Sequence, residues 1–161
     1  MDSYEAFDHI VSNSSYPMYI VTATGEHRAG CLVGFASQAS ITPRRFLVML
    51  SKANHTYRVA QRVHHLAVHF LGAADRDLAA LFGEETGDDT DKFARCEWKV
   101  GPEGTTIVPA SCGWAVGRII ERVDTGDHVG HLMELVEARV GRDGPPLTSR
   151  HVSDMEPGHP A

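Results

Sequence analysis

The sequence of 161 residues contains no long apolar run and very little cysteine. No stretch approaches the roughly 20 apolar residues that a helix needs to cross a bilayer. The acidic start of the chain is not followed by the apolar core of a signal peptide. Its three cysteines, Cys31, Cys96 and Cys112, are odd in number and are not spaced as metal-binding pairs. These absences predict a protein of the reducing cytoplasm, in which Cys31 and Cys112 are buried thiols.

Positive charge is also scarce. Lysine and arginine together number 15 against 21 acidic residues, which gives a net charge of −6 at pH 7. A protein that binds nucleic acid non-specifically needs a basic surface that displaces counterions from the phosphates. The sequence therefore excludes that class of function.

The common metal motifs are missing, although the chain has ten histidines. It has no HxH, HExxH or paired CxxC spacing. His64 and His65 are adjacent and precede a predicted strand, in which neighbouring side chains point to opposite faces and cannot chelate one ion well. We expect no metal site.

Neither G-x-G-x-x-G nor G-x-x-x-x-G-K-[ST] is present, and strands and helices do not alternate regularly. The hydrophobic patterns predict helices over residues 2–11, 56–62 and 75–83, and strands over residues 16–24, 28–36, 45–51, 65–71, 96–100, 112–123 and 131–140. Many short strands with few helices favour an antiparallel, barrel-like sheet of about six or seven strands with short peripheral helices. We expect one domain over residues 1–147, an acidic surface loop over residues 84–91, and a loose, extended tail over residues 148–161.

The segment from Gly30 to Thr56 is the first candidate site. It is predicted to form two strands joined by a polar turn, followed by a helix that Asn54 caps. Free backbone N–H groups, the helix dipole, the Lys52 ammonium and the Thr56 hydroxyl could converge on one phosphate. The alternative is an ordinary capped helix beside a solvated lysine.

The Gly126-Asp127-His128 series is the second candidate. The glycine allows a tight turn, and Asp127 can fix the tautomer or orientation of His128. The alternative is a hairpin loop with a solvated histidine.

An ordered series of motifs resembles the flavin reductase-like family of FMN-binding split β-barrels. It begins with G-x-x-x-x-x-A-S-x-x-S-x-x-P from Gly30 to Pro43 and continues with S-K-x-N-x-T from Ser51 to Thr56. Further landmarks follow in family order: Ala67–Leu71, Leu78 with Phe82, Asp91-Lys92-Phe93, Gly126-Asp127-His128 and Pro146-Leu147. Leu32, Gln38, Arg44 and the residues after Leu147 depart from the usual family pattern.

The resemblance implies a site for each part of the cofactor. Residues facing the isoalloxazine ring or the ribityl hydroxyls would be Gly34, Phe35, Ala36, Ser37, Gln38 and Ser40. Residues holding the phosphate and ribityl end would be Ser51, Lys52, Asn54, His55 and Thr56. His128, oriented by Asp127, would lie on the nicotinamide side of the ring.

The implied function is NAD(P)H-dependent reduction of FMN or FAD by a homodimer that passes reduced flavin to a partner oxygenase or another acceptor. Hydride would move from NADH or NADPH to the flavin, which performs the chemistry itself. Two alternatives remain open: a flavin-binding carrier or sensor without turnover, and a split barrel that uses F420 or haem.

Overall fold

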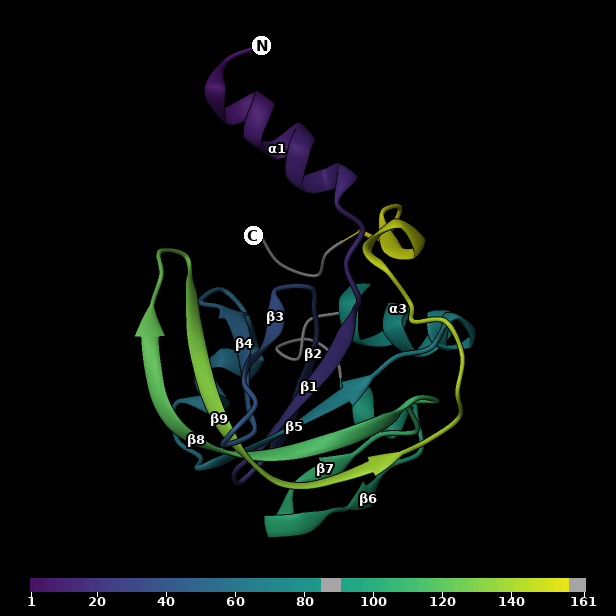
Figure 1. The fold of residues 1–161 in the computed structure, drawn as a ribbon. Helices are drawn as coiled ribbons and strands as arrows, with labels where there is room; N and C mark the ends of the chain where they lie inside the picture. Colours follow the sequence, from purple (N-terminus) through teal and green to yellow (C-terminus); the bar gives the residue numbers. More distant parts are fainter. Residues whose placement is uncertain (85–90, 157–161) are drawn as a thin grey trace.

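The computed structural model describes residues 1–84 and 91–156, which form a seven-stranded antiparallel sheet with short helices around it (Figure 1). The strand order is β2-β1-β5-β8-β9-β4-β3, and a separate two-stranded sheet pairs β6 with β7. The strands are β1 Tyr19–Thr24, β2 Arg28–Val33, β3 Ala36–Ser40, β4 Arg45–Ser51, β5 His65–Phe70, β6 Lys99–Val100, β7 Thr106–Ile107, β8 Gly113–Asp124 and β9 His128–Val140. The predicted antiparallel sheet with peripheral helices is confirmed.

The central strands carry the core. In β5, residues 66–69 are all buried, as the continuous apolar run predicts for a strand covered on both faces. His69 is among them. Its Nδ1 donates to the Ile20 carbonyl at 2.8 Å, and its Nε2 accepts from the Val108 N–H at 3.1 Å. A buried polar ring is stable when both nitrogens have partners.

Strands β8 and β9 form one long hairpin, which curves around the sheet in Figure 1. Their register shifts twice, between Val116 and Gly117 and between Ile119 and Glu121. Such irregularities bend strands and increase their twist. Strand β9 of the hairpin also pairs with β4. The register of this pair runs from Arg45 opposite Glu134 to Ser51 opposite His128.

The helices are α1 Ser3–Asn13, α2 His55–Ala60 and α3 Arg76–Glu84, with 3-10 turns η1 Ala73–Asp75, η2 Lys92–Ala94, η3 Pro102–Gly104 and η4 Ser149–Val152. Asp2 and Glu5 form a capping box at the start of α1. The predicted cap of α2 is confirmed, since the Asn54 side chain accepts from the Thr56 N–H at 2.8 Å. None of the helices in residues 1–84 and 91–156 is long and apolar enough to cross a membrane.

Lys92 is a buried lysine, only 4% exposed. Its Nζ donates to the carbonyls of Gly30 at 2.9 Å and Phe82 at 3.0 Å. The ammonium thereby joins β2 to the last turn of α3, where carbonyls lack partners within the helix.

Several predicted boundaries are wrong. The polar segment 36–40 is itself a strand, because its backbone pairs with β4 at the sheet edge. The predicted strand over 96–100 shortens to β6. The helix predicted from residue 75 begins at Arg76, and Asp75 belongs to η1. The Asp75 carboxylate accepts from the Gly72 N–H and from the backbone N–H and hydroxyl of Ser111.

Part of the predicted acidic loop, residues 85–90, lies outside the described residues, as do residues 157–161 of the tail. The described part of the tail is not loose. It contains η4, and Asp154 pairs with Arg76 at 2.9 Å. Leu147 is fully buried. The domain boundary after Leu147 stays a prediction.

Candidate functional site

The two motifs that the sequence singles out meet at one end of the sheet. The end of β4 pairs with the start of β9, so Ser51 lies opposite His128. The Lys52 N–H then donates to the Asp127 carbonyl at 2.9 Å. Its Nζ donates to Asp124 Oδ2 at 2.8 Å. We call this region, defined by Lys52, Asp124, Asp127 and His128, the polar mouth.

The charges of the polar mouth stabilise one another. The hydrogen bond to Asp124 raises the pKa of Lys52, and the same bond lowers the pKa of Asp124. Both side chains are open to solvent, so the pair contributes little to folding stability. An ammonium has three donors, and Asp124 takes one of them. The lysine therefore retains capacity to bind an anion.

His128 has a fixed orientation. Its Nδ1 lies 2.7 Å from Asp127 Oδ1, and this hydrogen bond lowers the pKa of the carboxyl. Because a carboxylate only accepts hydrogen bonds, Nδ1 of His128 carries the proton in this contact. Gly126 has φ of 136°, a value that favours glycine in this three-residue connection between β8 and β9. The expected Asp127–His128 contact is thus present in the structure.

A cavity of about 190 Å³ opens beside the polar mouth. It brings together five residues of the predicted site: Gly34, Phe35, Ser51, Asn54 and His128. The Phe35 and His128 rings lie 5.1 Å apart between centroids, and the Tyr16 ring lies 6.3 Å from that of Phe35. Phe35 is half exposed, so it offers an apolar surface at the edge of the cavity.

Gly34 is needed for this arrangement because of its contact with Tyr16. A Cβ at this position would lie 2.6 Å from Cε2 of Tyr16. Real side chains do not approach so closely, so any larger residue would displace the tyrosine ring. Gly34 lets Tyr16 form one wall of the cavity.

The expected cradle of free backbone amides is absent from this part of the structure. Acceptors within the chain already take the N–H groups of Lys52, Ala53, Asn54, Thr56 and Tyr57. Helix α2 has only six residues, which limits its dipole. The charge that this segment offers to an anion is therefore that of the Lys52 side chain.

Thr56 and His55 are less exposed to solvent than Lys52. Thr56 is buried, with 1% of its surface exposed, and its side chain contacts the Cys31 thiol. Burial raises the pKa of Cys31 to about 11, against the smaller lowering effects of Lys92 and Thr56. The thiol is inert at neutral pH. His55 begins α2 and is half-buried.

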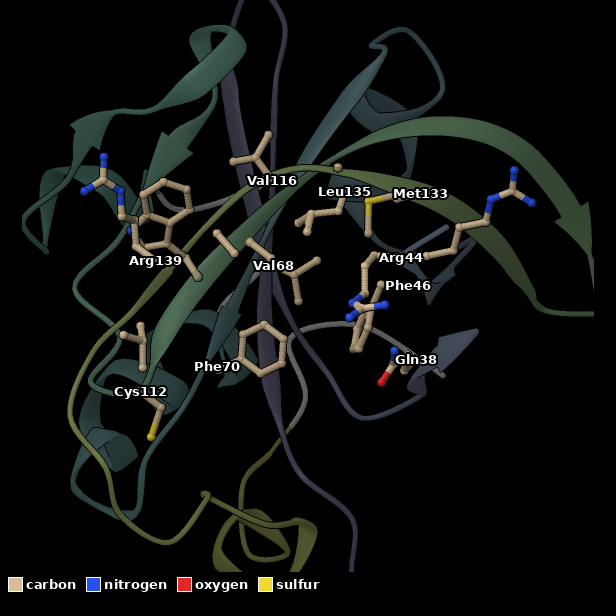
Figure 2. A pocket seen from close by; sticks show the side chains of 16 residues that line it. Gln38, Arg44, Phe46, Val68, Phe70, Cys112, Val116, Met133, Leu135 and Arg139 are labelled. Carbon is tan, nitrogen blue, oxygen red and sulfur yellow. The ribbon is translucent and has the colours of Figure 1, made fainter. Parts of the chain in front are cut away.

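The polar residues of β3 divide between two faces, because side chains alternate along a strand. Gln38 points into a second, larger cavity beside Phe46 and Phe70 (Figure 2). Ala36 also packs against the core. Ser37 is exposed and its hydroxyl donates to the Gln38 carbonyl, while the Gln38 amide donates to the Ser40 carbonyl. The structure does not place Gln38 with the residues of the polar mouth.

Two residues of the site escaped the sequence interpretation. Asp124 was predicted only as a loop residue, and Tyr16 only as the start of a strand. The pairing of β4 with β9, which brings Asp124 to Lys52, joins segments far apart in the chain. No local pattern predicts such a contact.

The chemical character of the residues at the cavity and the polar mouth matches that of flavin mononucleotide. A lysine suits a phosphate, the amide of Asn54 suits hydroxyls, and Phe35 suits an apolar ring. The cavity is smaller than the roughly 300–1,000 Å³ that encloses a whole ligand. It would hold part of the molecule, with the remainder outside it.

The chain is similar to known proteins in sequence and in fold. A family model described as flavin reductase like domain matches residues 11–153. FMN reductase (NADH) SmoA of Agrobacterium fabrum (strain C58) is 29% identical over 129 residues, which are 80% of this chain and 71% of that protein. Flavin-dependent monooxygenase, reductase subunit HsaB of Rhodococcus jostii (strain RHA1) is 29% identical over 120 residues, which are 70% of this chain and 60% of that protein.

The chain spans about two thirds of the length of the curated relatives it matches. Among solved structures, a flavin reductase domain protein from Arthrobacter sp. FB24 superimposes with a TM-score of 0.83 at 23% identity, covering 98% of this chain and 96% of that one. That likeness shows the fold. Since the family model covers most of the sequence and the fold agrees, the chain belongs to the flavin reductase-like domain family.

Proposed function

We propose that the protein is an NADH-dependent flavin reductase that binds FMN at the polar mouth and supplies reduced flavin to a partner oxygenase. The observation that carries this proposal is that Phe35, Asn54 and His128 line one cavity. Lys52 lies next to it, because it follows the lining residue Ser51 and its N–H donates to the carbonyl of Asp127. The names of the relatives point the same way, since one is an FMN reductase (NADH) and another is a monooxygenase reductase subunit. FAD in place of FMN and NADPH in place of NADH are outcomes of the tests below.

In this proposal, the chain binds and orients its two ligands. Lys52 binds the phosphate, either sharing its ammonium with Asp124 or exchanging one anion for the other. The ring of Phe35 provides apolar contact, and Gly34 lets Tyr16 form part of the cavity wall. When bound, the flavin accepts hydride from the reduced nicotinamide. His128, held by Asp127, positions the nicotinamide.

The protein would act in the cytoplasm as a homodimer. Its described cysteines are all free thiols, which suits a reducing compartment.

The first test separates the phosphate from the ring. Lys52→Ala should weaken FMN binding by roughly ten- to a hundredfold, because it removes the charged donor that binds the phosphate. Riboflavin has no phosphate and should bind equally well to both proteins. Quenching of flavin fluorescence measures both affinities.

Asp124→Asn is the matched control. It removes the competing anion and leaves the lysine in place, so FMN affinity should be retained or rise. Equal losses of FMN and riboflavin affinity in Lys52→Ala would contradict the proposed phosphate site. Failure of NADH and NADPH to reduce bound flavin would leave a flavin carrier or sensor.

The second test concerns the nicotinamide. His128→Ala should raise KM for NADH several-fold while changing FMN affinity less than twofold. Asp127→Asn keeps the shape but weakens the hydrogen bond that orients the ring, so it should give a smaller rise in KM. Steady-state oxidation of NADH with saturating FMN provides both values. An unchanged KM with lost FMN affinity would assign His128 to the flavin instead.

A further inference from the structure

Helix α1 lies outside the body of the protein. Figure 1 shows it projecting beyond the sheet, and none of its residues is buried. Tyr4, Phe7 and Ile10 follow one another at intervals of three and therefore share one face. Their exposed fractions are 86%, 64% and 65%. The helix thus presents an apolar stripe that nothing in the described chain covers.

An isolated helix of 11 residues is marginal in water. The capping box formed by Asp2 and Glu5 helps it to begin, but most helical stability in proteins comes from packing of an apolar face. Tyr4, Phe7 and Ile10 therefore indicate a docking surface elsewhere.

The chain carries a suitable groove. The larger cavity, about 380 Å³, has an apolar floor that includes Phe46, Phe70 and Met133 (Figure 2). Leu135 and Val140 of β9 also line it, and their side chains are exposed. A monomer rarely leaves so continuous an apolar surface uncovered.

The groove and helix α1 carry opposite charges. Three arginines and no carboxylate line it: Arg44, Arg45 and Arg139. Two carboxylates outside the lining offset part of this charge: Glu134 lies 3.9 Å from Arg45, and Glu137 accepts from Arg139 at 3.4 Å. Helix α1 has the opposite character. The segment from Asp2 to Asn13 contains three acidic residues, Asp2, Glu5 and Asp8, and no lysine or arginine.

We propose that α1 of one copy docks in the arginine-rimmed groove of a second copy, with the exchange made reciprocally. Each copy has one helix and one groove, so a twofold arrangement satisfies both and closes. Helix α1 projects away from the sheet of its own chain (Figure 1), which favours the groove of a second copy. Only Ser14 and Ser15 separate the helix from Tyr16, whose backbone is held by Ser149 through two hydrogen bonds.

The first experiment removes the apolar stripe. Sedimentation equilibrium should show a concentration-dependent dimer for the full chain. Phe7→Ser with Ile10→Ser should raise its dissociation constant at least about a hundredfold, given the free energy of burying two large side chains. Ile41→Ser with Val100→Ser is the matched control, because both residues are equally exposed but lie outside the groove and α1. The control should dimerise normally.

The second experiment exchanges charges. One variant carries Glu5→Gln with Asp8→Lys, which keeps an acceptor in the capping box. The other carries Arg44→Glu with Arg139→Glu. Each alone should dimerise at least about tenfold more weakly, and an equal mixture should recover association. In the mixed dimer, one helix–groove pair is native and the other has both charges reversed.

A full chain that stays monomeric at all concentrations would overturn the proposal. So would a dimer that is insensitive to the α1 substitutions, or a mixture that does not recover. Circular dichroism checks that each variant is folded. The proposal does not depend on the reductase function, because none of these substitutions touches the polar mouth and flavin reduction is measured separately.

Discussion

Lys92 and Lys52 differ in their burial and in the partners of their ammonium groups. Lys92 is buried and donates to two main-chain carbonyls that join β2 to α3. Lys52 is exposed and pairs with one exposed carboxylate, Asp124. A buried donor cannot exchange its partners for water without large cost, whereas an exposed donor can.

The difference extends to the histidines. His69 is buried and has both ring nitrogens bonded to the backbone, whereas His128 lies at the polar mouth with one nitrogen on Asp127. Polar groups in the interior therefore determine stability, and those at the mouth remain available to a ligand. Three substitutions or titrations test this division.

The largest effect is expected at Lys92. Lys92→Met keeps the length of the side chain but leaves the carbonyls of Gly30 and Phe82 without a donor. The free energy of unfolding should fall by at least about 3 kcal/mol, because two hydrogen bonds from a charged group are lost and each contributes about 1.5–3 kcal/mol. Urea denaturation measures the change. Lys99→Met, at an exposed position on β6, should change stability by less than about 0.5 kcal/mol. Equal effects of the two substitutions would refute the distinction.

The second effect is a pH dependence at His69. Burial lowers its pKa to about 4, against 6.5 for an exposed histidine, although the hydrogen bond to Ile20 opposes the shift. The folded state therefore requires the neutral ring. Its contribution is complete above pH 6.5 and is lost as pH falls toward 4, by up to about 3 kcal/mol.

This titration can be isolated with His69→Gln. The variant should be less stable than the wild type at pH 7.5, and the difference should shrink at pH 4.5. His131, whose pKa burial also lowers to about 4, is present in both proteins and cancels. A difference that stays constant with pH would show that His69 is not the group that titrates.

The sequence predicted the local features of the site well. Strand β4 was predicted at its observed bounds, and Asn54 caps α2 as expected. These features depend on hydrogen bonds and patterns within a few residues, which local propensities describe. The contact of Asp127 with His128 is local in the same way.

The remaining features depend on tertiary structure. Segment 36–40 has a turn-like composition, but pairing with β4 makes it a strand at the sheet edge. The same pairing turns Gln38 toward the larger cavity. A lysine in sequence is normally solvated, so nothing local marks Lys92 as buried. The pairing of distant strands and the burial of single side chains could not be inferred from the spacing of residues in the sequence.

The smallest effect on stability is expected at Lys52. Its pair with Asp124 is exposed on both sides, and solvent screens such pairs so that they contribute little to stability. Lys52→Ala should therefore change the urea midpoint very little, even though it weakens FMN binding. A clear fall in the urea midpoint would instead show that the pair holds the β8–β9 hairpin against β4. The loss of FMN affinity would then follow from a displaced hairpin. Repeating the denaturation with Asp124→Asn distinguishes the two, because holding the hairpin requires both partners whereas a phosphate site requires only the lysine.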